Sequence, residues 1–234
     1  MRERVIVSLG AGPQRRLLAI ARRTIEPYAQ RHGYDLQLRT EPPVSERPAP
    51  WAKIQIMREL VERYELVVWL DADLVIVDPR EDIASELERD KLLYLVEHRH
   101  DGWRMPNTGV MMLRGGRAAA DFLDATWSLD RYEQHRWWEN AAVCDLLGYD
   151  LDPPRSVRST PLLANTKFIS PGWNWIVDAR SANPRIRHFP GYSLRTRTAL
   201  MLAATTEARA RALLRADANA SGALLTPRRQ SRRR

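Results

Sequence analysis

The amino-terminal third of the chain alternates between short apolar runs and amphipathic stretches, and this alternation limits the fold more than any other feature. Apolar runs at 4–9, 34–38 and 66–70 have the length and composition of strands, and stretches at 13–28 and 51–64 repeat apolar residues at helical spacing. Strands that alternate with helices favour a mostly parallel sheet with helices on both faces. The run at 66–70 is apolar at every position, which is typical of a central strand buried on both sides.

The rest of the chain extends this α/β pattern with weaker signals. We expect a single domain over residues 1–217 and a disordered basic tail over 218–234, because the chain length suits one domain. Residues 152–186 are rich in proline, asparagine and serine, and no element is assigned to them. The further predicted elements are a helix at 83–87, strands at 92–96 and 110–113, a polar loop at 98–106, and helices at 117–129, 137–147 and 196–216.

Hydropathy and cysteine content set the compartment that we expect. With 44% hydrophobic residues, the chain of 234 residues can bury a sizeable core. No apolar run approaches the ~18 residues of a membrane-spanning helix, and the first residues are too polar for a signal peptide. The single cysteine, Cys144, excludes an intrachain disulfide and lies among apolar residues, as a core side chain would. We therefore predict a cytoplasmic protein.

The positive charge of the chain is concentrated at its C-terminal end. The formal net charge is +8, and five arginines lie within residues 228–234. A block of like charge at a terminus is usually disordered, and it can also hold a protein at an anionic membrane or nucleic acid. We leave a solvated tail and a peripheral membrane contact open. A nucleic-acid-binding protein is a disfavoured alternative, because the remaining residues are nearly balanced in charge.

The strongest candidate for chemistry is Asp71-Ala72-Asp73, directly after the apolar run at 66–70. Ligands of parallel sheets bind beyond the carboxyl ends of the strands, where this pair is expected to lie. In an extended chain the two carboxylates point the same way, and a divalent cation relieves their repulsion. Mg²⁺ binds one or two carboxylates together with substrate phosphates, whereas Mn²⁺ accepts the same oxygens and an imidazole as well. The structural alternative is that both aspartates cap the strand and the turn after it.

Four segments resemble glycosyltransferases of the GT-A fold. Residues 51–54, Trp-Ala-Lys-Ile, and the run at 67–76 resemble the lysine-bearing helix of these enzymes and their apolar strand that ends in Asp-x-Asp. Residues 107–114, Asn-Thr-Gly-Val-Met-Met-Leu-Arg, resemble a later strand, and residues 188–191, His-Phe-Pro-Gly, resemble a late histidine motif. Over residues 5–192 the chain is similar to the galactosyl/xylosyl/mannosyltransferase family that includes xyloglucan xylosyltransferases.

The resemblance implies a single GT-A (Rossmann-like) domain and a metal-dependent enzyme. It implies transfer of a sugar from a nucleoside-diphosphate sugar, first of all a UDP-sugar, to the hydroxyl of an unknown acceptor, with retention of configuration. It also implies that Asp71, Asp73 and His188 hold Mn²⁺ or Mg²⁺, and that Asp71 reaches the donor ribose. Asn107 and Gly109 would line the donor sugar pocket, although a turn into a strand also explains Gly109.

Further positions carry less specific signals. Lys53 would contact phosphate or be an exposed helix residue. Glu139 stands at the start of a predicted helix, where the family places an acid beside the reacting sugar; a first-turn acid favoured by the helix dipole is the alternative. The family's phosphate-gripping lysine is replaced by Ser193, so Arg195 or Arg197 would take its role, because guanidinium pairs well with phosphate.

Three tryptophans are candidates for the acceptor site. Trp103, Trp173 and Trp175 fall in segments that we expect to be polar loops. Aromatic faces stack on the C–H faces of sugars, and an indole N–H can donate a hydrogen bond. The alternative is that these side chains are partly buried anchors of their loops.

A second enzyme class also fits the aspartate pair. Asp71-Ala72-Asp73 satisfies the first motif of haloacid-dehalogenase-like phosphatases, with Asp71 as nucleophile and Asp73 as acid/base. That motif normally lies near the start of a chain, whereas a strand–helix–strand–helix unit precedes it here. We therefore keep the phosphatase as the runner-up.

Overall fold

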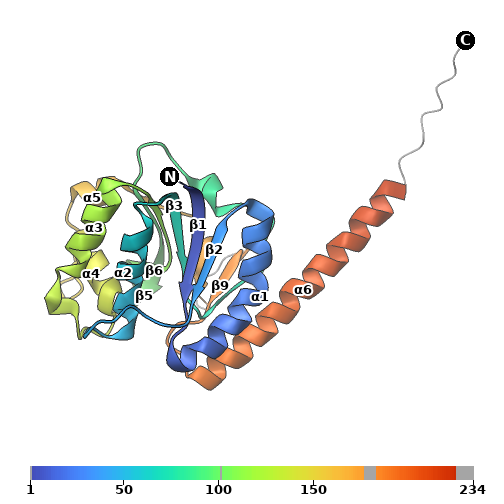
Figure 1. Ribbon diagram of the computed structural model, residues 1–234, viewed down its shortest axis with the longest axis horizontal. Helices are drawn as coiled ribbons and strands as arrows, with labels where there is room; N and C mark the ends of the chain where they lie inside the picture. Colours follow the sequence, from blue (N-terminus) through green and yellow to red (C-terminus); the bar gives the residue numbers. More distant parts are fainter. Residues whose placement is uncertain (1, 101, 177–182, 225–234) are drawn as a thin grey trace, which may run out of the picture.

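A six-stranded sheet forms the centre of the molecule (Figure 1). The structure is a computed structural model and describes residues 2–100, 102–176 and 183–224. The strands run in the order β2-β1-β3-β6-β5-β7, and β6 is antiparallel to both of its neighbours while the other pairs are parallel. The predicted mostly parallel sheet is confirmed. The strand bounds are β1 Arg2–Leu9, β2 Asp35–Arg39, β3 Tyr64–Leu70, β5 Leu93–His100, β6 Trp103–Arg114 and β7 Thr166–Phe168.

Helices cover both faces of this sheet, as predicted (Figure 1). One face carries α1 (Arg15–His32) and α6 (Leu194–Leu224), which pack on each other and on the sheet. The other face carries α2 (Ala52–Leu60), α3 (Arg117–Trp127) and α4 (Trp138–Leu146). Within the described part of the chain, no helix has the length and hydropathy needed to span a membrane.

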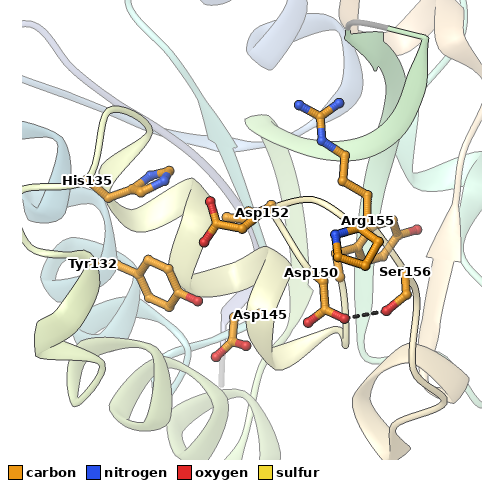
Figure 2. A pocket seen from close by; sticks show the side chains of 10 residues that line it. Tyr132, His135, Asp145, Asp150, Asp152, Arg155 and Ser156 are labelled. Atoms are coloured by element: carbon orange, nitrogen blue, oxygen red, sulfur yellow. Dashed lines mark hydrogen bonds between the residues drawn. The ribbon is translucent and has the colours of Figure 1, made fainter.

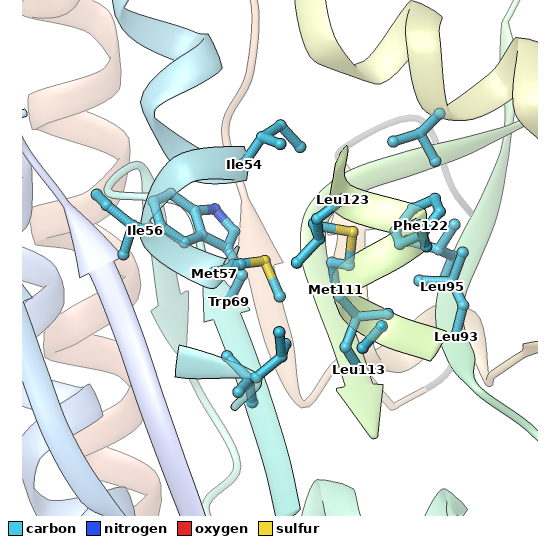
Figure 3. Close-up of a cluster of buried hydrophobic side chains, with 14 of the residues drawn as sticks. Ile54, Ile56, Met57, Trp69, Leu93, Leu95, Met111, Leu113, Phe122 and Leu123 are labelled. Carbon is cyan, nitrogen blue, oxygen red and sulfur yellow. The ribbon is translucent and has the colours of Figure 1, made fainter. Parts of the chain in front are cut away.

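The apolar run in β3 is explained by its position between the two helical layers. Val67 and Trp69 pack into the cluster beneath α2, α3 and α4, and Figure 3 shows Trp69 beside Met57 of α2. Leu66 and Val68 belong to the cluster beneath α1 and α6. Because successive side chains of a strand point to opposite faces, a strand covered on both has to be apolar throughout.

A small second sheet brings a strand from late in the sequence next to the end of β3. It contains β4 (Leu74–Ile76), β9 (Ile186–His188) and β8 (Trp175–Ile176), in the order β4-β9-β8. The strands β4 and β9 are antiparallel, with Leu74 opposite His188. This register places His188 beside Asp73, although the two residues are 115 positions apart in the sequence.

The prediction of a polar loop at 98–106 is wrong. This segment is a β-hairpin, in which β5 and β6 pair as far as His100 opposite Trp103. The side chains of Arg99 and Arg104 are exposed, so the strands remain polar while their backbones pair. Asp101-Gly102 is a dipeptide typical of a two-residue hairpin turn, and it is the sequence signal for this hairpin.

Three further boundaries differ from the predictions. The predicted helix at 51–64 ends earlier, as α2, at Leu60, and Tyr64 already starts β3. The predicted helix at 83–87 is a single 3-10 turn at Ile83–Glu86. The predicted helix at 196–216 is confirmed as α6, but it continues to Leu224 and so passes the expected domain end at 217. Residues 225–234, with the arginine-rich segment, lie outside the described residues, and the disordered tail stays a prediction.

Candidate metal and donor site

Two carboxylates and one imidazole meet at the carboxyl end of β3. Asp71 and Asp73 lie in the turn between β3 and β4, and His188 ends β9. Nε2 of His188 lies 3.2 Å from Oδ1 of Asp73 and 3.7 Å from Oδ2 of Asp71. One ligand atom from each residue can be chosen so that all three lie within 4.8 Å of one another. Oxygen and imidazole ligands at this spacing fit a divalent cation, and Mn²⁺ accepts this combination.

The ring of His188 is oriented by a chain of amide hydrogen bonds. Nδ1 of His188 lies 2.9 Å from Oδ1 of Asn174, and Nδ2 of Asn174 donates to Oδ1 of Asn107 over 2.8 Å. An amide oxygen only accepts, so Nδ1 carries the proton and Nε2 faces the two carboxylates. Such a second partner for a ligand histidine is usual in metal sites. No local sequence pattern pointed to Asn174, because its partner lies in another element.

Gly109 leaves the space that His188 occupies. Its backbone N–H donates to Oδ1 of Asn107 over 2.9 Å, and its carbonyl accepts from the N–H of Asp71 over 2.8 Å. A Cβ atom at this position would lie 2.2 Å from Cε1 of His188. The structure therefore assigns this glycine to close packing against His188, the candidate metal ligand. The alternative of a turn into a strand is wrong, because Gly109 lies within β6 and not before it.

Replacing Gly109 by alanine should weaken Mn²⁺ binding by about 10- to 100-fold, the usual effect of disturbing the support of a ligand histidine. The added methyl group would push the imidazole away from the two aspartates. Titration calorimetry with MnCl₂ measures the affinity. An unchanged affinity in a folded Gly109→Ala protein would show that His188 is not a ligand.

Lys53 is buried between the aspartate pair and Glu139. Its Nζ lies 2.9 Å from Oε1 of Glu139 and 3.1 Å from Oδ1 of Asp71. It also donates to the carbonyl and hydroxyl oxygens of Thr108, over 3.1 and 3.2 Å. Burial alone would lower the pKa of Lys53, but the two carboxylates outweigh it and raise that pKa, so the ammonium is charged.

These contacts correct the interpretation of Lys53. The side chain is only 4% exposed, so the exposed helix residue is wrong. An ammonium has three N–H donors, and the surrounding protein oxygens already take them up. The structure thus replaces the predicted phosphate contact with a link between Asp71 and Glu139.

Among the described residues, hydrogen-bond donors hold one carboxylate oxygen of Asp71, and the other oxygen faces His188. Its Oδ1 accepts a hydrogen bond from Nε1 of Trp69 over 2.6 Å and lies next to Lys53. Its Oδ2 is on the side of His188. The ring of Trp69 therefore packs in the core, while its N–H holds Oδ1 of Asp71. The other oxygen, Oδ2, is left directed at the candidate cation position.

Glu139 lies in the first turn of α4 and is only 5% exposed. Its Oε1 accepts from Lys53 and from Oγ1 of Thr108, the latter over 3.2 Å. The preceding residue, Trp138, has a φ of 43°, a left-handed conformation that is uncommon outside glycine and is found at functional sites. The structure places Glu139 next to Lys53, which in turn contacts Asp71, and its role beside the reacting sugar stays a prediction.

Arg197, and not Arg195, reaches the aspartate pair. Nη1 of Arg197 donates to Oδ2 of Asp73 over 2.8 Å. Arg195 lines a shallow hollow with Arg16 and Leu202 instead. Two residues apart on a helix, side chains project nearly opposite ways, so only one of these arginines can face the site. Burial would raise the pKa of Asp73, but His188 and Arg197 outweigh it and hold that pKa below its ordinary value.

Parts of the sequence are similar to known proteins. Residues 12–100 match the galactosyl transferase GMA12/MNN10 family. An uncharacterised alpha-1,2-galactosyltransferase of Schizosaccharomyces pombe is 36% identical over 73 residues, which are 28% of this chain and 20% of that protein. The present chain thus corresponds to a small part of the length of that curated relative.

Similar solved structures extend over most of the chain. A glycosyltransferase involved in the glycosylation of the major capsid of PBCV-1 has a TM-score of 0.64 at 19% identity, over 85% of this chain and 99% of that one. The galactosyltransferase LgtC, solved with donor and acceptor sugar analogues, has a TM-score of 0.53 at 11% identity, over 85% and 95%. This chain has the GT-A glycosyltransferase fold. The predicted fold is confirmed, and the predicted resemblance to the galactosyl/xylosyl/mannosyltransferase family is confirmed over residues 12–100.

Within this GT-A domain, the three candidate acceptor tryptophans differ. Trp173 is fully buried in the core beneath α1 and α6, and its Nε1 donates to Glu86 over 2.9 Å. The predicted acceptor contact of Trp173 is therefore wrong, because the ring has no exposed face. Trp103 and Trp175 are partly buried, and the Nε1 atom of each has no hydrogen-bond partner among the described residues. Their acceptor role stays a prediction.

One hollow of the GT-A domain lies away from Asp71, Asp73 and His188. Its volume is about 530 Å³, and Figure 2 shows Tyr132, His135 and Asp152 around it. None of the predicted site residues lines it. Two of its acidic side chains, Asp145 and Asp150, are engaged by neighbouring arginine and serine side chains. We assign no chemistry to this hollow.

Proposed function

We propose that this chain is a metal-dependent glycosyltransferase that moves a sugar from a nucleoside-diphosphate sugar to an acceptor hydroxyl. The observation that carries this proposal is the cluster of Asp71, Asp73 and His188, with Nε2 directed at both carboxylates. The cluster lies beyond the carboxyl end of a central strand, where α/β sheets bind their ligands. The family match and the GT-A fold support sugar transfer as the reaction.

The three ligands favour Mn²⁺ over Mg²⁺, because one of them is an imidazole. When bound, the cation supplies charge stabilisation to the departing nucleoside diphosphate. Asp71 and Asp73 would hold it through carboxylate oxygens, and His188 would hold it through Nε2. Asn107 is partly exposed beside this cluster and remains our candidate for a contact with the donor sugar. A UDP-sugar is the donor that we expect.

The transfer step is proposed to proceed with retention and without a covalent intermediate. Glu139 is connected to Asp71 through Lys53, and its Oε1 is already engaged by Lys53 and Thr108. A carboxylate held in this way is suited to stabilise positive charge on the reacting sugar, and less suited to attack it. The acceptor hydroxyl would then enter on the same face as the leaving diphosphate.

The direct test is binding of UDP with and without Mn²⁺, followed by a screen of nucleotide sugars for metal-dependent hydrolysis. We expect UDP to bind in the presence of Mn²⁺, and we expect this binding to disappear when EDTA is added. Binding of UDP that is indifferent to EDTA would contradict the metal site. Tight RNA binding without any response to UDP would favour the nucleic-acid alternative.

Replacing Glu139 by glutamine should lower turnover by about a hundredfold while the donor affinity stays nearly unchanged. The amide keeps the shape and removes the charge that would act in the transition state. The measurements are donor affinity by calorimetry and turnover with a competent acceptor. Glu133→Gln, a partly exposed acid shortly before α4, is the matched control. Wild-type turnover in Glu139→Gln would leave Glu139 as a buried partner of Lys53 and remove it from the mechanism.

The location of the protein remains a separate proposal. We propose a cytoplasmic protein whose arginine-rich segment, residues 228–234, contacts anionic membrane. Cell fractionation and sedimentation with anionic vesicles, with and without this segment, would test it.

A further inference from the structure

Arg197 occupies one of the oxygens that a cation would need. Its Nη1 donates to Oδ2 of Asp73 over 2.8 Å, while Nε and Nη2 donate to the carbonyl of Tyr192 over 3.1 and 2.8 Å. Oδ1 of Asp73 faces Nε2 of His188. Both oxygens of this carboxylate are therefore already engaged by side chains from other elements.

A cation at the cluster would compete with this contact. It would draw on Asp73, and its charge would repel the guanidinium a few ångströms away. Arg197 therefore lowers the affinity of the cluster for a cation when no nucleotide is bound. The opposing charge is partly buried, since the side chain of Arg197 is 18% exposed and that of Asp73 is 11% exposed, so water screens the repulsion only in part.

A nucleoside diphosphate would offer the guanidinium of Arg197 an alternative partner. Its phosphate oxygens are better partners for a guanidinium than a carboxylate that is shared with a metal, and arginine binds phosphate in a two-pronged geometry. The diphosphate would arrive at the same cation that displaces Arg197 from Asp73. Arg197 would then exchange one anionic partner for another at short range.

We propose that Arg197 is a positioning residue that holds Asp73 in the free protein and passes to the diphosphate when cation and donor bind together. This inference rests on the proposed function. Its consequence is coupling: the cation binds weakly alone, and each of the two ligands strengthens the binding of the other. By linkage the factor is the same in both directions.

Two affinities of the Arg197→Gln variant test this proposal, and they should change in opposite directions. Without nucleotide, the variant should bind Mn²⁺ about tenfold more tightly than the wild type, because Asp73 is released. At saturating Mn²⁺ it should bind UDP about tenfold more weakly, because the phosphate contact is lost; both values lie within the usual range of coupling between sites. Mn²⁺ affinity is read from the electron paramagnetic resonance signal of the free ion, and UDP affinity from calorimetry.

The controls separate this proposal from a structural role. Arg195→Gln removes the same charge two residues away and should change neither affinity, since Arg195 does not reach the cluster. Arg197→Lys keeps the charge and loses the fork, so it should fall between the wild type and Arg197→Gln, and it serves as the test if the glutamine variant does not fold. An unchanged or weaker Mn²⁺ affinity in a folded Arg197→Gln protein would overturn the exchange. If the wild type itself shows no Mn²⁺-dependent binding of UDP, the proposed function is overturned instead.

Discussion

Asp73→Asn should abolish Mn²⁺-dependent binding of UDP and lower turnover by about a thousandfold or more. A bound cation contributes several kcal/mol to the transition state, and each 1.36 kcal/mol is a factor of about ten in rate. The substitution removes the carboxylate that faces both His188 and Arg197. The amide has the same shape, so packing in the turn after β3 is retained.

The measurements for Asp73→Asn are UDP calorimetry at several Mn²⁺ concentrations and turnover of the donor. Asp90→Asn is the matched control, because Asp90 is an exposed acid with one long ion pair and it lies outside the cluster. The control should behave as the wild type. Retention of Mn²⁺-dependent UDP binding in Asp73→Asn would show that the cation, if it binds, is held elsewhere.

Lys53→Met should lower the free energy of unfolding by about 3–5 kcal/mol, the usual cost of removing one partner of a buried ion pair. The substitution leaves Glu139, a carboxylate that is only 5% exposed, without its cation. It also removes one of the two partners of Oδ1 of Asp71 and leaves Trp69, so the proposed metal ligand is held less firmly and turnover should fall as well. Guanidinium chloride unfolding measures the stability change.

The double variant Lys53→Met/Glu139→Gln separates the two consequences of this substitution. Removing both charges should recover part of the lost stability, because no uncompensated buried carboxylate remains beside α2. Turnover should stay low, because Asp71 still lacks its contact with Lys53 and residue 139 no longer carries a negative charge. A single Lys53→Met variant that is as stable as the wild type would contradict the buried pair.

Much of the fold was predictable because its signals are local. The apolar run in β3 follows from burial on both faces, and the helices α1 and α2 follow from apolar residues at helical spacing. The aspartate pair after β3 could be placed at the ligand-binding edge for the same reason. The hairpin at 98–106 was not predicted, because most of its residues are polar, as in a loop.

The contacts around Lys53 and Trp173 were not predictable from local pattern. Lys53 meets Glu139 across 86 positions of sequence, and Trp173 meets Glu86 across 87. A lysine in a helix and a tryptophan in a proline-rich segment look exposed unless the partner is known. In both cases the partner lies on an element that only packing brings near.

By itself the sequence determined which side chains could do chemistry and at which strand end the aspartates would lie, because periodicity and turn residues act over a few positions. The tertiary structure decided which of those side chains meet. The pairing of β4 with β9 brings His188 to Asp73, and the rotation of α6 directs Arg197 to the cluster and Arg195 away from it. The reason is physical: strand register and helix rotation are set by the packing of distant apolar faces, and a shift of one residue in either would turn these side chains elsewhere.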